Sequence, residues 1–207
     1  MAEKLNVLWD TCVLYRWLTK SPVEFVDHIS EYAKDAEDGK VGIFISSMAL
    51  AELRPSLVVN TGETPASIVS RLCGFIAIID TVPDIMSLAG ELRDNRFVCS
   101  TDGPKVPERT RPLSPGDAIQ LATGIWMREY AGVQDLEFHT FDEGKRKDTI
   151  DGKTVPMIGF HNWCKGLDSV EVVSLAKELK RKKPDHPRCP LPKTNPNSTN
   201  SAKPPAS

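Results

Sequence analysis

The sequence lacks the features that define several common protein classes. No stretch approaches the roughly 20 consecutive apolar residues that a transmembrane helix requires, and the N-terminus has no apolar region typical of a signal peptide. The five cysteines are scattered and never form a CxxC pair, so neither a disulfide framework nor a four-thiolate zinc site is indicated. We therefore expect an unexported, cytoplasmic protein that is not bound to a membrane.

The composition indicates one globular domain followed by a tail of different character. The chain has 207 residues, of which 40% are hydrophobic, which suffices for a core of two or three layers. Residues 180–207 carry seven Lys or Arg residues and one Asp and are rich in Pro, Ser and Asn, whereas residues 1–179 carry 19 basic and 27 acidic residues. We predict a folded domain over residues 1–179 and a basic, proline-rich, disordered tail over residues 180–207.

Short apolar segments alternate with segments of helical periodicity. The predicted strands are LNVLW (5–9), VGIFIS (41–46), FIAIID (75–80), LEFHTF (136–141) and VEVVSL (170–175). The segments between them have apolar residues three and four positions apart, which is typical of amphipathic helices. This alternation predicts an α/β fold, a three-layer α/β/α sandwich with a central parallel sheet.

Four acidic residues occur where the pattern predicts the rim of that sheet. Asp10 and Asp142 directly follow predicted strands, and ligands of open parallel sheets bind outside the carboxyl ends of the strands. Glu52 and Asp117 lie in helical segments near the same rim. Each acid also has a simpler interpretation as a helix cap, a first-turn acid or a surface residue. Together, four carboxylates repel one another unless protons or cations compensate them, and oxygen ligands without His or Cys indicate Mg²⁺ or Mn²⁺.

These acids lie in four motifs that resemble those of a known family. DTCVL (10–14), SSMALAEL (46–53), LSPGDAIQLATG (113–124) and HTFDEG (139–144) occur in the order found in PIN-domain nucleases, especially the VapC-type toxins. The similarity extends over roughly residues 5–145. It implies a PIN-like fold, a site for Mg²⁺ or Mn²⁺, and hydrolysis of single-stranded RNA that leaves a 5′-phosphate and a 3′-hydroxyl. Relative to the compact toxins, residues 97–115 and 148–166 look like insertions.

The resemblance assigns roles to individual residues. Asp10, Glu52, Asp117 and Asp142 match the acidic quartet and are the implied catalytic and metal-binding residues. Thr11 and Thr140 match supporting hydroxyl residues, and Glu143 is a candidate outer ligand. Because the rest of the domain is acidic, the candidates for binding the RNA backbone are its basic residues Arg93, Arg96, Arg109, Arg111, Lys145, Arg146 and Lys147.

Several functions remain open at this stage. The chain is interpreted as an endoribonuclease acting on single-stranded or structured RNA, and as a possible toxin of a toxin–antitoxin pair. The alternatives are a catalytically weak PIN-like binding module in an RNA-processing assembly and a structure-directed DNA nuclease. A toxin implies an antitoxin protein that occludes the site. Homodimerisation is common in the family, and Tyr15 and Trp17 are either contacts for it or core residues.

Two unrelated enzyme classes are excluded by the sequence. A P-loop NTPase requires a GxxxxGK stretch, and none is present. A phosphatase of the haloacid-dehalogenase type requires a second Asp two residues after the first, and Cys12 occupies that position relative to Asp10.

Overall fold

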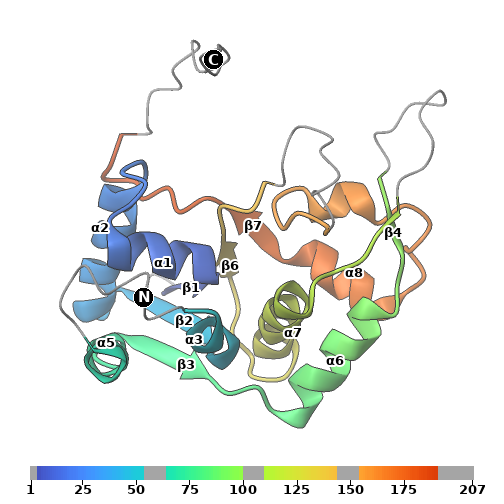
Figure 1. The fold of residues 1–207 in the computed structure, drawn as a ribbon, viewed down its shortest axis with the longest axis horizontal. Helices are drawn as coiled ribbons and strands as arrows, with labels where there is room; N and C mark the ends of the chain where they lie inside the picture. The colour runs from blue at the N-terminus through green and yellow to red at the C-terminus, as the bar shows by residue number, and fades with distance from the viewer. Residues whose placement is uncertain (1–3, 54–63, 100–109, 144–153, 191–207) are drawn as a thin grey trace, which may run out of the picture.

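The computed structural model describes residues 4–53, 64–99, 110–143 and 154–190. The central sheet has the strand order β3-β2-β1-β6-β7, and all neighbouring strands in it are parallel (Figure 1). Its strands are β1 (Leu5–Trp9), β2 (Val41–Ser46), β3 (Ile76–Ile79), β6 (Leu136–His139) and β7 (Lys180–Lys182). The predicted central parallel sheet is therefore confirmed.

Helices cover both faces of this sheet and form two separate cores. One core includes residues of α1 (Thr11–Thr19), α2 (Val26–Glu37) and α5 (Pro65–Leu72), and the other includes residues of α6 (Pro83–Arg93), α7 (Pro115–Glu129) and α8 (Glu171–Glu178). Side chains of β1 alternate between the cores, because Val7 and Trp9 belong to the first and Leu8 to the second. This arrangement is the predicted α/β/α sandwich.

The topology places the carboxyl ends of β1 and β6 at a switch point. From β1 the chain proceeds to β2 and β3 on one side of the sheet, and later adds β6 and β7 on the other side (Figure 1). Connections on opposite sides leave a crevice beside the strand at which the order reverses, and such crevices bind ligands in open α/β sheets. Asp10 follows β1 here, and Thr140 follows β6. The short helix α3 (Ser47–Glu52) begins directly after β2.

The prediction of a strand over residues 170–175 was wrong. This segment is part of the helix α8, and its buried residues Val172, Val173 and Ala176 lie on one helical face packed against α6 and α7. The run of β-branched residues suggested a strand, but β propensity depends strongly on tertiary context. The fifth strand of the sheet is the charged segment β7, which immediately follows this helix.

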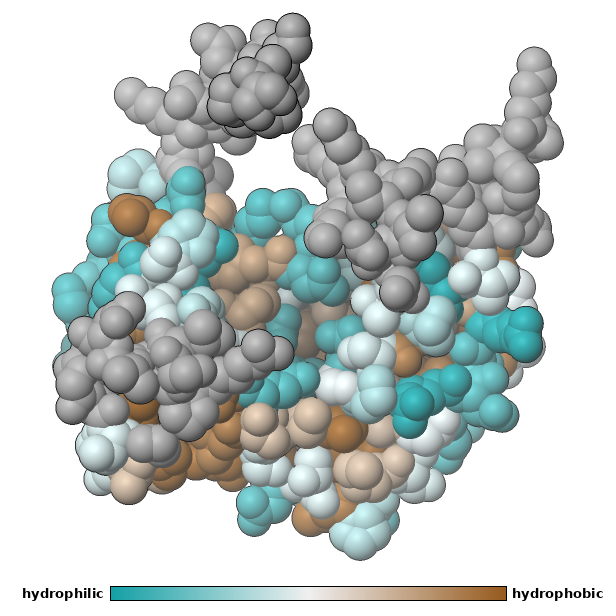
Figure 2. Space-filling view, in the orientation of Figure 1, coloured by the Kyte–Doolittle hydropathy of each residue, from teal (hydrophilic) through white to brown (hydrophobic). Residues whose placement is uncertain are grey.

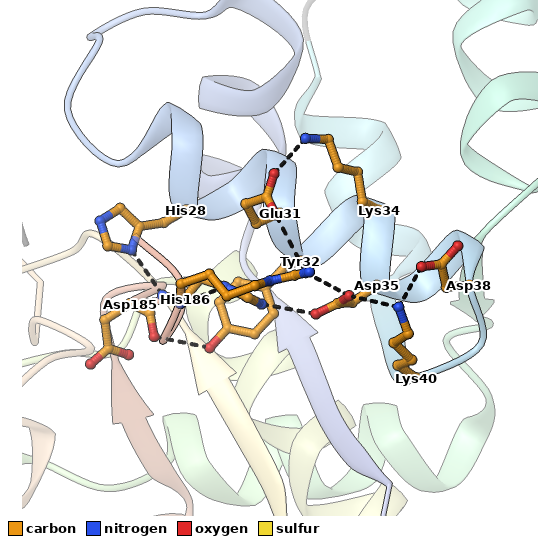
Figure 3. A network of polar contacts seen from close by, with 10 residues as sticks. His28, Glu31, Tyr32, Lys34, Asp35, Asp38, Lys40, Asp185 and His186 are labelled. Carbon is orange, nitrogen blue, oxygen red and sulfur yellow. Dashed lines mark hydrogen bonds and ion pairs between the residues drawn. The ribbon is translucent and has the colours of Figure 1, made fainter. Parts of the chain in front are cut away.

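The boundary of the folded domain at residue 179 was also wrong. Residues 180–182 pair with β6, and the chain beyond them is fixed to α2 by buried polar groups (Figure 3). His186 is 6% exposed and its Nε2 lies 2.9 Å from Asp35 Oδ2, while its backbone N–H donates to His28 Nδ1 over 2.8 Å. Tyr32 donates its hydroxyl to the carbonyl of Asp185. The folded unit therefore extends to residue 190, and residues 191–207 lie outside the described part of the chain.

The two predicted insertions are only partly described. β4 (Phe97–Val98) and β5 (Thr110–Arg111) form a small antiparallel pair at the ends of the first insertion, and residues 100–109 between them lie outside the described residues. In the second, residues 154–166 include a 3₁₀ helix (Phe160–Trp163). None of the described helices is long and apolar enough to span a membrane.

Candidate active site

Asp10 lies at the carboxyl end of β1 with its carboxylate held by three other side chains. Thr140 Oγ1 donates to Asp10 Oδ2 over 2.5 Å and Cys12 Sγ donates to the same oxygen over 3.0 Å, while Gln120 Nε2 donates to Oδ1 over 2.9 Å. Burial raises the pKa of Asp10, which is 8% exposed, and the hydrogen bonds from Thr140 and Cys12 act in the opposite direction. Asp10 occupies the N-cap position of α1 but makes no side-chain capping hydrogen bond. The simple capping interpretation therefore does not explain its carboxylate.

Glu52, at the end of α3, shares a hydrogen-bond donor with Asp10, the side-chain amide of Gln120. Thr11 Oγ1 donates to Glu52 Oε2, and Gln120 Nε2 lies 2.8 Å from Thr11 Oγ1 and 3.5 Å from the same Glu52 oxygen. Gly116 makes this position of Glu52 sterically possible, since a Cβ atom on residue 116 would lie 2.1 Å from Glu52 Oε1. The glycine at this position in α7 thus provides the space that the glutamate occupies.

Asp117 is both a first-turn residue of α7 and a member of the acidic group. Ser114 accepts a hydrogen bond from the Asp117 backbone N–H over 3.1 Å and donates its hydroxyl to Asp117 Oδ2 over 2.5 Å. Burial raises the pKa of Asp117 to about 7, and the negative charges of Asp10, Asp142 and Glu52 add to this increase against the opposing hydrogen bond from Ser114. The helix-start interpretation is correct, but it does not remove the repulsion among the acids.

Asp142 completes the group from the segment after β6. Its backbone N–H donates to Thr140 Oγ1 over 3.0 Å, and its Oδ2 accepts from the backbone N–H of Met157 over 3.0 Å. The adjacent Glu143, a predicted outer ligand, instead forms an ion pair with Lys183 at 2.8 Å. Because Lys183 belongs to the segment after β7, that ion pair links the end of β6 to the C-terminal part of the fold.

All four predicted carboxylates line a single cavity of about 470 Å³. The lining residues are Asp10, Thr11, Cys12, Tyr15, Arg16, Ser21, Pro22, Glu52, Leu53, Asp117, Phe141 and Asp142. A cavity of similar volume lies at the amino ends of β1 and β6, but two of its three acids, Glu178 and Glu137, are paired with Arg128 and Lys180. Among the residues that line the first cavity, Arg16 is the one with a basic side chain, and its guanidinium contacts the ring of Phe141 and the carbonyl of Glu24.

The predicted RNA-binding residues lie away from this cavity or outside the described residues. Arg93 and Arg96 are exposed at and just after the end of α6 and do not line the cavity. Arg111 lies over the ring of Trp163 at 4.3 Å and donates to the carbonyl of Thr154. The remaining candidates, Arg109, Lys145, Arg146 and Lys147, lie in the segments that the structure does not describe.

Sequence reasoning assigned no place in the cavity to three residues that shape it, among them Tyr15, which was interpreted as a dimer contact or a core residue. Gln120 lies one helical turn after Asp117, so its i+3 spacing on α7 was the available signal that both side chains face the same region. On α1, Tyr15 lies one turn after Thr11 and Arg16 lies one turn after Cys12, so helical spacing was the available signal for these two residues as well. Of these, Gln120 contacts Asp10, Thr11 and Glu52 at once, and its Oε1 is buried without a hydrogen-bond partner.

The donor set fits a hard divalent cation. The cavity offers carboxylate and hydroxyl oxygens, and burial together with the neighbouring negative charges raises the pKa of Asp117, an effect that a bound cation would oppose. Among the described residues, no three His, Cys, Asp or Glu side chains are grouped so that one ion could contact all of them. Mg²⁺ commonly keeps several of its water ligands and binds through one or two carboxylates, so the cavity is compatible with such a site.

Comparisons with known proteins assign no family to the chain. No family model matches it, and no curated protein matches it. Among solved structures, the Mycobacterium tuberculosis toxin VapC20, described as cleaving the sarcin-ricin loop, is similar with 18% identity and a TM-score of 0.41 over 66% of this chain and 90% of that chain. VapBC2 from Rickettsia felis, solved with a DNA fragment from its promoter, is similar with 17% identity and a TM-score of 0.39 over 65% of this chain and 98% of that chain.

Proposed function

We propose that this protein is a PIN-like endoribonuclease that depends on Mg²⁺ or Mn²⁺ and hydrolyses phosphodiester bonds of single-stranded RNA. The observation that carries the proposal is the set of four carboxylates lining one cavity at the switch point of a parallel sheet. Crowded, partly buried carboxylates are costly for a folded protein, and a divalent cation offsets that cost. The order of the four motifs in the sequence supports the same function.

The residues of the cavity divide into ligands and residues that orient them. Asp10 and Asp117 would hold the cation directly, with Glu52 and Asp142 as further ligands, either direct or through water. A bound divalent cation activates water for attack and stabilises negative charge on the phosphate. Thr140 fixes Asp10 by its short hydrogen bond, and Gln120 holds the Asp10 and Glu52 carboxylates in a common position.

As part of this proposal, the protein acts as the toxin of a toxin–antitoxin pair. The resemblance of its motifs to those of VapC-type toxins supports this role. An acidic cavity is readily blocked by a basic side chain, because hydrogen bonds between a guanidinium or ammonium group and carboxylates are strong. An antitoxin that inserts such a side chain should abolish cleavage when added at an equimolar amount to the purified protein.

A second candidate function is a PIN-like binding module without efficient catalysis. Two observations favour it: the carboxylate of Asp10 already accepts three hydrogen bonds from protein side chains, and no three-ligand group exists among the described residues. This candidate predicts that Mn²⁺ neither binds tightly nor changes the thermal stability of the protein. The proposed nuclease function instead predicts that Mn²⁺ raises the melting temperature, because a ligand that binds only the folded state stabilises that state.

The nuclease proposal is tested first by analysing the products of RNA cleavage. End-labelled single-stranded RNA is incubated with the protein and Mg²⁺, Mn²⁺ or EDTA. We expect cleavage only with the metal ions and products that carry a 5′-phosphate and a 3′-hydroxyl. Products with a 2′,3′-cyclic phosphate would contradict the proposal, because they arise by transesterification through attack of the ribose 2′-hydroxyl. Equal cleavage in EDTA would contradict it as well, because such cleavage needs no divalent cation.

Gly116→Ala should reduce cleavage without unfolding the protein. The added methyl group would occupy the position of Glu52 Oε1, so the flexible glutamate side chain must leave the cavity. Because a displacement of about 1 Å at a reacting centre can cost roughly a hundredfold in rate, we expect a loss of that order. Activity and melting temperature are measured together on the same preparation.

Gly90→Ala is the matched control for this change. Gly90 also lies inside a helix, α6, but no atom lies within 4 Å of the position of an added Cβ. It should leave cleavage unchanged and stabilise the protein by up to about 1 kcal/mol, since alanine favours a helix over glycine. Equal cleavage rates for the two variants would show that Glu52 is not required at its observed position.

A further inference from the structure

One wall of the cavity is aromatic rather than acidic. Tyr15 lies one helical turn after Thr11 on α1, and Phe141 lies between Thr140 and Asp142 after β6. Both side chains are half-buried, and the ring of Phe141 also packs edge-on against Phe25, with 5.5 Å between the ring centroids. The aromatic rings therefore lie beside the carboxylates, in the same cavity and partly open to solvent.

Arg16 adds a fixed positive charge to this wall. Its guanidinium carbon lies 3.7 Å from the ring centroid of Phe141, and its Nη1 donates to the backbone carbonyl of Glu24 over 2.8 Å. Among the described residues lining the cavity, Arg16 is the one with a basic side chain. We refer to Tyr15, Arg16 and Phe141 together as the aromatic wall.

The character of the surface around the cavity is mixed in the same way. Figure 2 shows hydrophobic and hydrophilic residues side by side over the region in which Figure 1 draws α1 and α3. The cavity volume of about 470 Å³ lies within the range of roughly 300–1,000 Å³ found for small-molecule sites. A ligand that fills it must present a negative, cation-binding part to the acids and a flat apolar part to the aromatic wall.

We propose that the aromatic wall binds one nucleobase of the RNA strand, stacked against Tyr15, next to the phosphate that lies at the carboxylates. A nucleotide has both required parts, because its phosphate binds cations and its base has an apolar face. Single-stranded nucleic acids are bound in this way, by bases that stack on aromatic side chains and on arginine. Arg16, held in place over Phe141, contacts the strand beside that base. This inference rests on the proposed ribonuclease function.

The role of Tyr15 is tested by RNA affinity in a variant that does not cleave. Binding of a short, fluorescently labelled single-stranded RNA to the full chain carrying Asp10→Asn is measured by anisotropy in Mn²⁺. Stacking of a base on an aromatic side chain contributes about 1–3 kcal/mol, so adding Tyr15→Leu should weaken binding by about 5- to 150-fold. Tyr15→Phe, which keeps the ring, should restore most of the lost affinity.

Tyr130→Leu is the matched control for loss of a tyrosine. Tyr130 is 66% exposed directly after α7 and does not line the cavity, so its replacement should not change RNA affinity. Melting temperatures of all variants are compared, so that weak binding by a misfolded protein is recognised.

A second arm leaves the aromatic wall intact and changes the RNA. In a series of RNAs, a single abasic nucleotide is moved along the strand. One position should weaken binding to the Asp10→Asn protein by the same factor as Tyr15→Leu, and the protein with both substitutions should be insensitive to the abasic nucleotide at that position. The inference would be overturned if, at every position of the abasic nucleotide, the loss of binding free energy simply added to the loss caused by Tyr15→Leu. Tyr15 would then not contact a base.

The outcomes separate this inference from the proposed function. If the unaltered protein cleaves RNA with Mn²⁺ but Tyr15→Leu binds RNA as tightly as its parent, the nuclease proposal stands and the base-binding role is wrong. The aromatic wall would then be a contact surface for a protein partner. If the unaltered protein neither cleaves nor binds RNA, both proposals fail together.

Discussion

Asp10→Asn is expected to lower the rate of metal-dependent RNA cleavage by on the order of a thousandfold, equivalent to about 4 kcal/mol of activation free energy. Asparagine has nearly the same shape and keeps an oxygen that accepts from Thr140 or Gln120, so the packing around β1 is retained. What the substitution removes is the negative charge that, in the proposed site, would hold the cation. Initial cleavage rates are compared at saturating Mn²⁺.

Asp94→Asn serves as the control for this prediction. Asp94 is an exposed acid at the C-terminal end of α6, away from the cavity, and its replacement removes one negative charge from the surface. We expect it to cleave RNA at the rate of the unaltered protein. Cleavage by Asp10→Asn within a fewfold of that rate would show that the metal does not depend on Asp10.

Asp117→Asn is expected to stabilise the metal-free protein while it abolishes cleavage. The pKa of Asp117 is about 7 in the folded protein, compared with an ordinary value of 3.8 in an unfolded chain, so the folded state binds this proton more tightly than the unfolded state. The free energy of unfolding therefore falls as the pH rises from about 4 to about 7 and stays low above that range. Asparagine does not ionise, and its advantage should be larger at pH 8 than at pH 5, by roughly 3 kcal/mol.

This prediction is measured by denaturant unfolding in EDTA at both pH values. Asp94→Asn, which also removes one carboxylate, controls for the general effect of charge. Saturating Mn²⁺ should reverse the order at pH 8, because only the unaltered protein retains its full set of ligands and gains stability from the cation. A metal-free Asp117→Asn protein that is less stable than the unaltered protein at pH 8 would contradict the electrostatic explanation of this cavity.

The positions of the acids could be predicted from the sequence because a simple topological rule governs them. Asp10 and Asp142 follow strands that alternate with helices, and parallel strands direct the residues after them to one edge of the sheet. Glu52 and Asp117 were placed near that edge by their helical segments. The structure brings all four to one cavity.

What could not be predicted depends on contacts between residues distant in the sequence. Lys180 and Lys182 of β7 both pair with Glu137, which is buried in β6. The hydrogen bond with His139, together with those from the two lysines, holds the pKa of Glu137 well below its usual range. Nothing in the local composition of residues 180–182 indicates this pairing. Similarly, the burial of His186 depends on His28 and Asp35 in α2, more than 150 positions earlier.

The local patterns also misled where two structures suit the same residues. Val172 and Val173 belong to a β-branched run that is typical of strands, yet together with Ala176 they form the buried face of α8. The spacing i, i+1, i+4 of these residues is typical of a helix, whereas their β-branched composition is typical of a strand. Only the packing against α6 and α7 decides between helix and strand.

Above all, we propose that the four carboxylates of one cavity form a metal-dependent nuclease site. The most direct measurement is cleavage of end-labelled single-stranded RNA by the unaltered protein and by the folded double variant Asp10→Asn, Asp117→Asn, side by side in Mn²⁺ and in EDTA. We predict cleavage by the unaltered protein in Mn²⁺ alone and no cleavage by the double variant. Equal cleavage by both proteins, or none by an unaltered protein that also fails to bind Mn²⁺, would contradict the claim.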